Sequence, residues 1–171
     1  MPDITFIHTA DEHFDTDTHG SINPATGLNR AWESNADATA SAVEAALEHQ
    51  VDAFVSSGDM FKNGRPSQEA LLLAAETLRP LVDAGIPLVL LGGNHERLQV
   101  PTSQRTATDT LGEILTPHGE VHVVERSPRL VRLDSGIQVA ALPWLSKTTV
   151  LSKLGIEQDD PVHGDRAVVQ F

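Results

Sequence analysis

The sequence predicts an α/β fold in which mixed β-sheets are flanked by helices. In the first half of the chain, short apolar runs alternate with helical patterns in the order β-α-β-α-β, which is typical of a parallel sheet with right-handed crossovers. In the second half, three further β runs follow one another with brief turns, which favours a hairpin layer. We therefore expect a sandwich of mixed sheets, built as a single domain over residues 1–171.

The first half contains three predicted strands and two predicted helices. The strands are apolar runs, and a long polar loop rich in Asp, Thr, Gly and Asn follows the first of them. Apolar residues of the first helix recur on one face. Ser67 is the predicted N-cap of the second helix, which stops near Gly85. In chain order these elements cover residues 4–8, 30–50, 53–56, 67–85 and 86–93.

The second half begins with a short predicted helix that ends at Gly119. Three β runs, a small helix and a last apolar strand follow it. Because that strand ends the sequence, we expect the domain to be incomplete at its C-terminus. In chain order these elements cover residues 106–119, 121–125, 129–133, 137–145, 149–155 and 165–171.

Charge and composition exclude several classes of protein. The chain carries 12 Lys and Arg against 24 Asp and Glu, a net charge of -12, which counts against a large basic surface that coats DNA. A local site where metal ions supply the positive charge remains compatible with this balance. The chain has no cysteine, which excludes disulfides and thiolate metal sites. No apolar run approaches 18 residues, so we expect no membrane segment and a cytoplasmic protein.

Polar residues that can bind metal follow each of the first three strands. Asp11 and His13 follow the first, Asp59 the second, and Asn94 and His95 the third. Because the carboxyl ends of parallel strands share one edge of a sheet, we expect these side chains to meet there. This mixture of oxygen and nitrogen ligands suits manganese, iron, zinc or magnesium. A carboxylate such as Asp59 can bridge two ions that together clamp a phosphate.

Three motifs in these segments resemble those of calcineurin-like metallophosphoesterases. They are "DEH" at 11–13, "GDMF" at 58–61 and "GNHE" at 93–96. The surrounding "FIHTADEHFD", "SSGDMFKNGRPS" and "ALPWL" resemble the nuclease branch of that family, which includes bacterial SbcD and the double-strand-break repair nuclease. The resemblance covers roughly residues 4 to 145. It implies a metallophosphoesterase-type α/β sandwich.

The resemblance also implies a role for each of these residues. Asp11 and His13 match ligands of a first metal ion, Asp59 matches the bridging ligand, and Asn94 matches a ligand of the second ion. His95 matches the catalytic histidine that contacts the scissile phosphate and helps to protonate the leaving oxygen. The intact enzyme is expected to hold two divalent ions, with manganese the favoured metal.

Two departures from the family pattern bear on this expectation. Lys62 stands where several relatives carry His or Asp, and it either meets a phosphate or is simply solvated. The later GH and GHxH motifs, which supply further histidine ligands in the family, do not occur in this sequence. We therefore expect weak or single-metal occupancy, and low nuclease activity, for this chain alone.

The leading hypothesis is a metal-dependent phosphodiesterase of the DNA repair or recombination nuclease type. The resemblance implies DNA as substrate and a coiled-coil ATPase of the SbcC type as partner, and a homodimer is a further assembly to consider. Arg65, Arg97 and Arg105 flank the motifs and either contact DNA phosphates or are solvated. Two alternatives remain open: a phosphatase or cyclic-nucleotide phosphodiesterase of the same superfamily, and a non-catalytic scaffold that has lost catalytic histidines.

Overall fold

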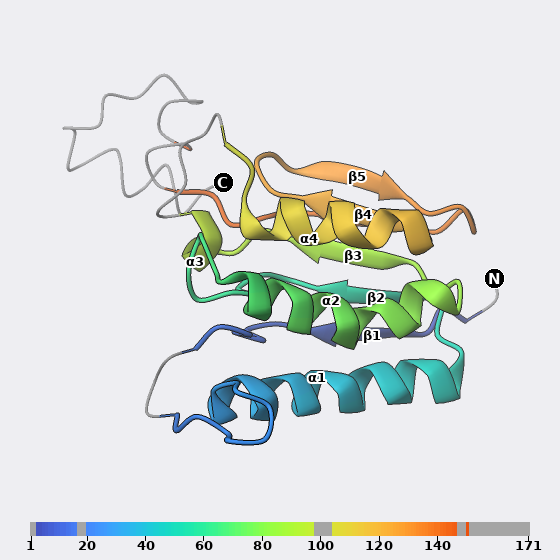
Figure 1. Cartoon of the computed structure of the whole chain (residues 1–171). Helices are drawn as coiled ribbons and strands as arrows, with labels where there is room; N and C mark the ends of the chain where they lie inside the picture. Colours follow the sequence, from blue (N-terminus) through green and yellow to red (C-terminus); the bar gives the residue numbers. More distant parts are fainter. Residues whose placement is uncertain (1–2, 17–19, 98–103, 147–149, 151–171) are drawn as a thin grey trace.

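A parallel four-stranded sheet forms the centre of the computed structural model, which describes residues 3–16, 20–97, 104–146 and 150. The strands lie in the order β1-β2-β3-β4, so neighbours in sequence are neighbours in the sheet (Figure 1). The registers pair Thr9 with Ser56 and Ser56 with Leu90. The first three strands therefore end at nearly the same level. The strand bounds are Phe6–Thr9 for β1, Ala53–Ser56 for β2, Leu88–Leu91 for β3 and Val121–Val124 for β4.

Three helices cover one face of this sheet (Figure 1). They are α1 (Arg30–His49), α2 (Gln68–Asp83) and α4 (Ala107–Leu115), and the 3-10 turn η1 (Thr116–His118) continues α4. Their apolar faces form the larger core cluster together with strand residues such as Phe54 and Leu88, both fully buried.

Side-chain caps define where the helices begin. The Ser67 side chain accepts a hydrogen bond from the backbone N–H of Ala70, which confirms it as the N-cap of α2. Thr106 and Asp109 form a reciprocal capping box at the start of α4. At its far end, α1 stops where Gln50 adopts a left-handed backbone, with φ 49°.

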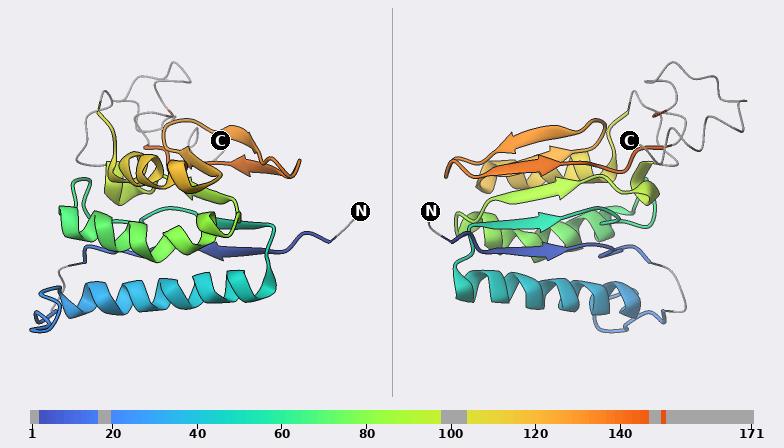
Figure 2. Two further views of the ribbon diagram at one scale, coloured as in Figure 1. Left: turned by 45° about the vertical axis from the view of Figure 1, so that its right-hand side comes forward. Right: turned by 180° about the vertical axis from the view of Figure 1, so that it is seen from behind.

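A two-stranded antiparallel hairpin packs on the other face of the sheet (Figure 2). Its strands are β5 (Arg129–Arg132) and β6 (Gln138–Ala141). Alternate residues of β3 point to opposite faces, so that Leu88 and Leu90 join the helix-side core while Val89 joins the hairpin-side core. Because β3 is buried on both faces, it reads in the sequence as an unbroken apolar run. The fold is thus the predicted α/β sandwich of parallel and antiparallel sheets.

One sequence prediction about the sheet is wrong. Residues 121–125 were expected in a hairpin layer with the next two strands, but β4 pairs in parallel with β3. The physical reason is that α4 lies between β3 and β4 in the chain, so β3-α4-β4 is another crossover unit that places its second strand beside the first. Only β5 and β6 form the expected hairpin.

Two further predictions fall outside the part of the chain that the structure describes. These are the small helix at 149–155, apart from Val150, and the strand at 165–171. Among the helices of the described residues, none has both the length and the apolar character that a membrane span requires.

Candidate metal centre

Three loops extend from the carboxyl ends of β1, β2 and β3, and we call them the β1 loop (residues 10–16), the β2 loop (57–63) and the β3 loop (92–97). The third contains a single helical turn, α3 (Asn94–Arg97), which sequence patterns did not indicate. The β1 loop carries Asp11 and His13, the β2 loop Asp59, and the β3 loop Asn94 and His95. All five candidate residues thus lie at one edge of the sheet.

The β1 and β2 loops are joined by backbone hydrogen bonds that continue beyond the ends of their strands. The N–H groups of Asp11, His13 and Phe14 donate to the carbonyls of Gly58, Asp59 and Met60, at 3.0, 3.1 and 3.0 Å. Phe14 is completely buried, so the β1 loop returns to the core directly after His13.

The backbone is strained at three of the candidate positions. Asp11, His13 and Asp59 have φ of 59°, 46° and 59°, and among described non-glycine residues only Gln50 shares a positive value. Such left-handed residues cost energy and cluster at functional sites, because surrounding structure must hold them there. In this molecule the constraint comes from the backbone hydrogen bonds between the β1 and β2 loops, which together we call the ladder between these loops.

Three side chains converge into a group that could hold a metal ion. One ligand atom from each of His13, Asp59 and His95 lies within 4.8 Å of the other two, and all three residues are partly buried. The two imidazole rings meet edge to face, with centroids 5.1 Å apart and an angle of 89° between their planes. His13 Nδ1 is buried and has no hydrogen-bond partner among the described residues. A carboxylate and two imidazoles, one with an unsatisfied nitrogen, fit a divalent transition metal.

The other two candidate ligands lie at the margin of this group. Asp11 Oδ1 is 3.7 Å from His13 Nε2, and the Asp11 side chain is largely exposed. Asn94 is the first residue of α3 and is half-buried. The metal roles of Asp11, His13, Asp59 and Asn94, and the phosphate role of His95, remain predictions.

Glycines allow the β2 and β3 loops to approach each other closely. A Cβ atom added to Gly58 would lie 2.9 Å from Gly93 Cα, and one added to Gly93 would lie 2.0 Å from Asp59 Oδ1. The His95 backbone N–H donates to the same Asp59 oxygen at 3.1 Å. The close contact of the two loops therefore depends on the absence of side chains at both positions.

Two buried carboxyl groups, Glu12 and Glu96, are adjacent in sequence to the candidate site residues. Glu96 is fully buried, and this burial raises its pKa to about 7, although a hydrogen bond from the Phe61 N–H acts in the opposite direction. Glu12 accepts hydrogen bonds from the hydroxyl groups of Thr9 and Ser56, yet its burial still raises its pKa. The candidate site therefore combines partly exposed polar side chains with two buried carboxyl groups, those of Glu12 and Glu96.

Asp15 is a functional candidate that sequence reasoning missed. It is almost fully buried, and its carboxylate accepts hydrogen bonds from the backbone N–H groups of Lys62 and Asn63 and from the Asn63 side chain. It therefore fixes the end of the β2 loop, including Lys62, against the β1 loop. In the sequence, Asp15 is marked only by its position directly after Phe14.

Comparisons with known proteins show which family this chain is similar to. The family model described as calcineurin-like phosphoesterase matches residues 4–168. Over 99 residues the chain is 32% identical to the uncharacterized metallophosphoesterase YhaO of Bacillus subtilis, an alignment that covers 57% of this chain and 24% of YhaO. Over 90 residues it is 37% identical to the DNA double-strand break repair protein Mre11 of Haloferax volcanii, covering 53% of this chain and 19% of that protein.

Among solved structures, the chain is similar to a dimetal phosphatase from Danio rerio, with 22% sequence identity and a TM-score of 0.43. The match covers 66% of this chain and 36% of the phosphatase chain. The matched segments span about a quarter or less of the two curated relatives, at 24% and 19% of their lengths.

Proposed function

Because the chain belongs to the calcineurin-like phosphoesterase family, we propose that it is a metal-dependent phosphodiesterase that hydrolyses DNA, of the repair or recombination nuclease type. The observation that carries this proposal is the convergence of His13, Asp59 and His95 from three separate loops at one sheet edge. The similarity to Mre11 proteins, which are named for DNA double-strand break repair, favours DNA over other phosphate esters.

Each residue of the site has a proposed task. Asp11 and His13 would hold a first divalent ion, Asn94 would hold a second, and Asp59 would be a ligand of both, with manganese as the favoured metal. When bound, the ions supply Lewis-acid activation of water and neutralise phosphate charge. His95 contacts the scissile phosphate, and one of its imidazole nitrogens gives a proton to the leaving oxygen. The backbone hydrogen bonds between the β1 and β2 loops keep Asp11, His13 and Asp59 in place before substrate arrives.

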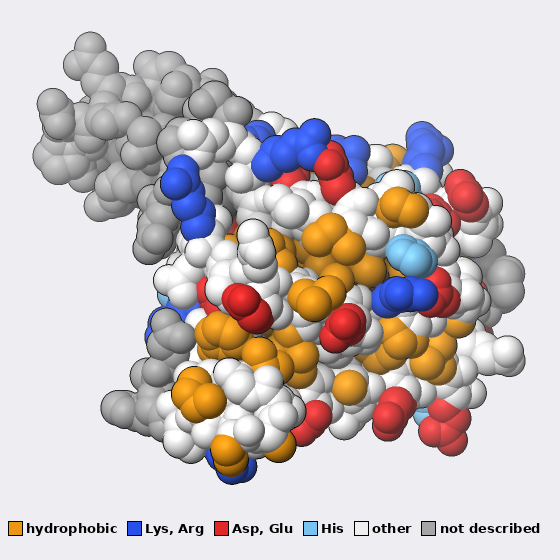
Figure 3. Space-filling model, viewed as in Figure 1, with side chains coloured by type: hydrophobic (Ala, Val, Ile, Leu, Met, Phe, Trp, Pro, Cys, Tyr) orange, Lys and Arg blue, Asp and Glu red, His pale blue; other side chains and the backbone are white. Residues whose placement is uncertain are grey.

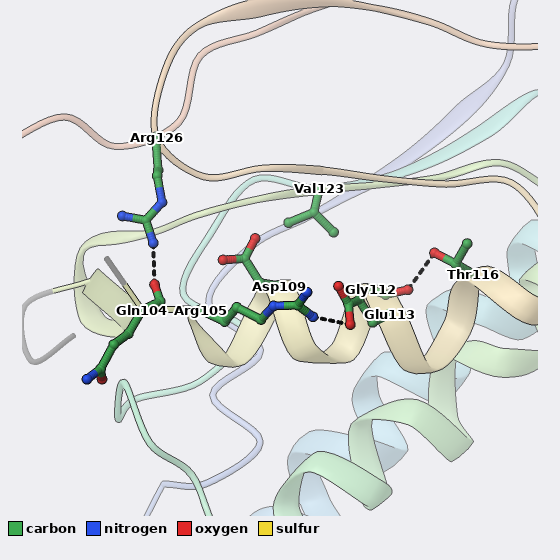
Figure 4. Close-up of a pocket in the computed structure, with 8 residues that line it drawn as sticks. All are labelled: Gln104, Arg105, Asp109, Gly112, Glu113, Thr116, Val123 and Arg126. Atoms are coloured by element: carbon green, nitrogen blue, oxygen red, sulfur yellow. Dashed lines mark hydrogen bonds and ion pairs between the residues drawn. The ribbon is translucent and has the colours of Figure 1, made fainter. Parts of the chain in front are cut away.

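Arginines beside the site are proposed contacts for the DNA backbone. Figure 3 shows several Lys and Arg side chains along the edge of the molecule above α4. Gln104 joins two of the arginines, since Arg65 Nη2 donates to its side-chain oxygen at 2.7 Å and Arg126 donates to its backbone carbonyl. Arg105 lies next to Gln104 in the chain and pairs with Glu113 (Figure 4).

Arg105 and Arg126 line a cavity of about 450 Å³ beside α4 (Figure 4). Of the three arginines predicted to flank the motifs, Arg65 and Arg105 thus lie in this cluster, and Arg126 joins them. The Arg97 side chain lies outside the described part of the structure. In an acidic chain, a local group of arginines supplies the phosphate contacts that position DNA without reading its sequence.

The similarity to the nuclease branch also supports proposals about the wider assembly. We propose a coiled-coil ATPase of the SbcC type as partner and a cytoplasmic location, with a homodimer as a further assembly to test.

Parallel hydrolysis assays test the proposed function. Labelled single-stranded DNA, a cyclic nucleotide and p-nitrophenyl phosphate are incubated with the full chain and Mn²⁺, with EDTA and Asp59→Asn as controls. We expect low, Mn²⁺-dependent cleavage that is faster for DNA than for the other two substrates. Faster hydrolysis of p-nitrophenyl phosphate or of the cyclic nucleotide would instead indicate one of the alternative enzymes. Mn²⁺ binding without hydrolysis of any substrate would indicate the scaffold.

A further inference from the structure

Among the three side chains of the "GNHE" motif, that of Glu96 is the one with no chemical task in the proposed reaction. It is the third residue of α3, and its side chain is fully buried, with 0% of its surface exposed. Charged side chains are almost never buried to this extent unless they are paired. Its contacts within the molecule therefore need an explanation.

Glu96 takes part in a reciprocal exchange of hydrogen bonds between two loops. The Phe61 N–H of the β2 loop donates to Glu96 Oε1 at 3.0 Å, and the His95 N–H of the β3 loop donates to Asp59 Oδ1 at 3.1 Å. Each loop thus provides a carboxylate that binds a backbone amide of the other. Because Gly58 and Gly93 allow the backbones to touch, both bonds form across a very short gap.

The Phe61 amide depends on Glu96 as its acceptor. Phe61 is itself completely buried, so its N–H group would lose a partner in the protein interior if Glu96 were replaced by an apolar residue. The second carboxylate oxygen, Glu96 Oε2, is buried without a hydrogen-bond partner in the described part of the chain. The fold therefore tolerates an unfavourable burial at this position, and the bond to Phe61 is what the carboxylate provides.

These contacts hold Asp59 from two sides. The His13 N–H donates to the Asp59 carbonyl from the β1 loop, while the exchange with Glu96 and His95 holds the β2 loop from the other direction. We propose that Glu96 is a positioning residue, which fixes the β2 loop against the β3 loop and so keeps the Asp59 carboxylate close to the imidazoles of His13 and His95. This inference rests on the proposed metal-dependent function, because the arrangement it preserves joins the proposed metal ligands His13 and Asp59 to His95, the proposed phosphate contact.

Two variants of the full chain separate the hydrogen bond from the charge. Glu96→Leu removes the acceptor at similar side-chain volume, whereas Glu96→Gln removes the charge but keeps an acceptor oxygen. Mn²⁺ affinity is measured by isothermal titration calorimetry, and amide hydrogen exchange at Phe61 and His95 is measured by NMR without metal. We expect Glu96→Leu to weaken Mn²⁺ binding by roughly 10- to 100-fold, as for other residues that orient metal ligands. Exchange at Phe61 should accelerate in the same variant, and Glu96→Gln should restore both properties.

Glu125→Gln is the matched control. It neutralises another buried carboxyl near Glu96, one that accepts a hydrogen bond from the Thr106 hydroxyl at 2.8 Å, and it should leave Mn²⁺ affinity unchanged.

Wild-type affinity in folded Glu96→Leu would overturn the inference, and so would an equal loss in Glu96→Gln and Glu96→Leu. If Glu96→Leu does not fold, an unprotected Phe61 amide in the wild-type chain overturns it. Absence of Mn²⁺ binding by the wild type refutes the proposed function instead, while the metal-free exchange data still decide on the loop contact.

Discussion

Gly93→Ala tests whether the close approach of the β2 and β3 loops determines metal binding. The new Cβ would lie 2.0 Å from Asp59 Oδ1 and 2.3 Å from the Asp59 backbone nitrogen, so the β2 loop must move. Overpacking of this kind costs about 1–3 kcal/mol of folding free energy. Because the displaced group is a proposed metal ligand, we also expect Mn²⁺ affinity to fall at least tenfold.

The control is Gly85→Ala at the end of α2. Gly85 has a φ of +78° and open space where the new Cβ would lie, so alanine there costs about 1–2 kcal/mol through backbone strain alone. The two substitutions thus have similar costs for folding, but only one of them acts on the site.

Denaturant unfolding followed by circular dichroism, in EDTA and in Mn²⁺, distinguishes the two effects. At a Mn²⁺ concentration one hundredfold above the wild-type Kd, bound metal stabilises the fold by about 2.7 kcal/mol, and a tenfold weaker site gains only about 1.4 kcal/mol. Gly93→Ala should therefore lose a further ~1.3 kcal/mol in Mn²⁺ relative to EDTA, and Gly85→Ala should not. The reasoning is refuted if Gly93→Ala gains as much from Mn²⁺ as the wild type does.

Three further predictions concern the core, the acid range and the DNA surface. Phe14→Ala removes a fully buried ring that anchors the β1 loop, and should lower the free energy of unfolding by about 3–5 kcal/mol. A thermal scan should show Tm lower by about 10 °C, and a shift near zero would contradict this anchoring role. Hydrogen bonds from Thr26 and Asn23 lower the pKa of Glu33 below its ordinary 4.5, so their stabilisation is present above pH 4.5 and is lost as pH falls through the lower folded pKa. Unfolding free energies of wild type and Glu33→Gln should accordingly differ at neutral pH and converge in acid, and a constant difference would exclude this titration. Arg126→Ala should reduce the salt dependence of DNA binding by about one unit of slope in fluorescence anisotropy, whereas an unchanged slope would remove Arg126 from the proposed DNA surface.

Sequence patterns predicted those parts of the fold that depend on local periodicity. The strand at 53–56 has the predicted bounds, because its three apolar residues stand between Asp52 and the polar turn residues that follow. The convergence of Asp59 with His13 and His95 followed from topology, since parallel strands bring their carboxyl ends to one edge. The placement of β4 failed because the short turns after it resemble those of a hairpin, and they outweighed the helix before it.

Long-range contacts account for what the sequence did not reveal. Glu96 and Phe61 are 35 residues apart, and Asp15 and Lys62 are 47 apart, so no local pattern signals that either carboxylate is buried against the β2 loop. The positive φ angles of Asp11, His13 and Asp59 were also not indicated by the sequence, and inter-loop hydrogen bonds help to maintain them.

The position of β1 has a consequence for how the site opens. In the described sheet β1 has a single neighbour, β2, whereas β2 and β3 are each paired on both sides. Since the hydrogen bonds between β1 and β2 continue into the β1 loop, we expect any fraying of this edge strand to displace Asp11 and His13 as well. The half of the site that carries Asp59, Asn94 and His95 stays with the interior strands. Opening of this edge would therefore separate Asp11 and His13 from the other three candidate residues, starting from a strand of only four residues.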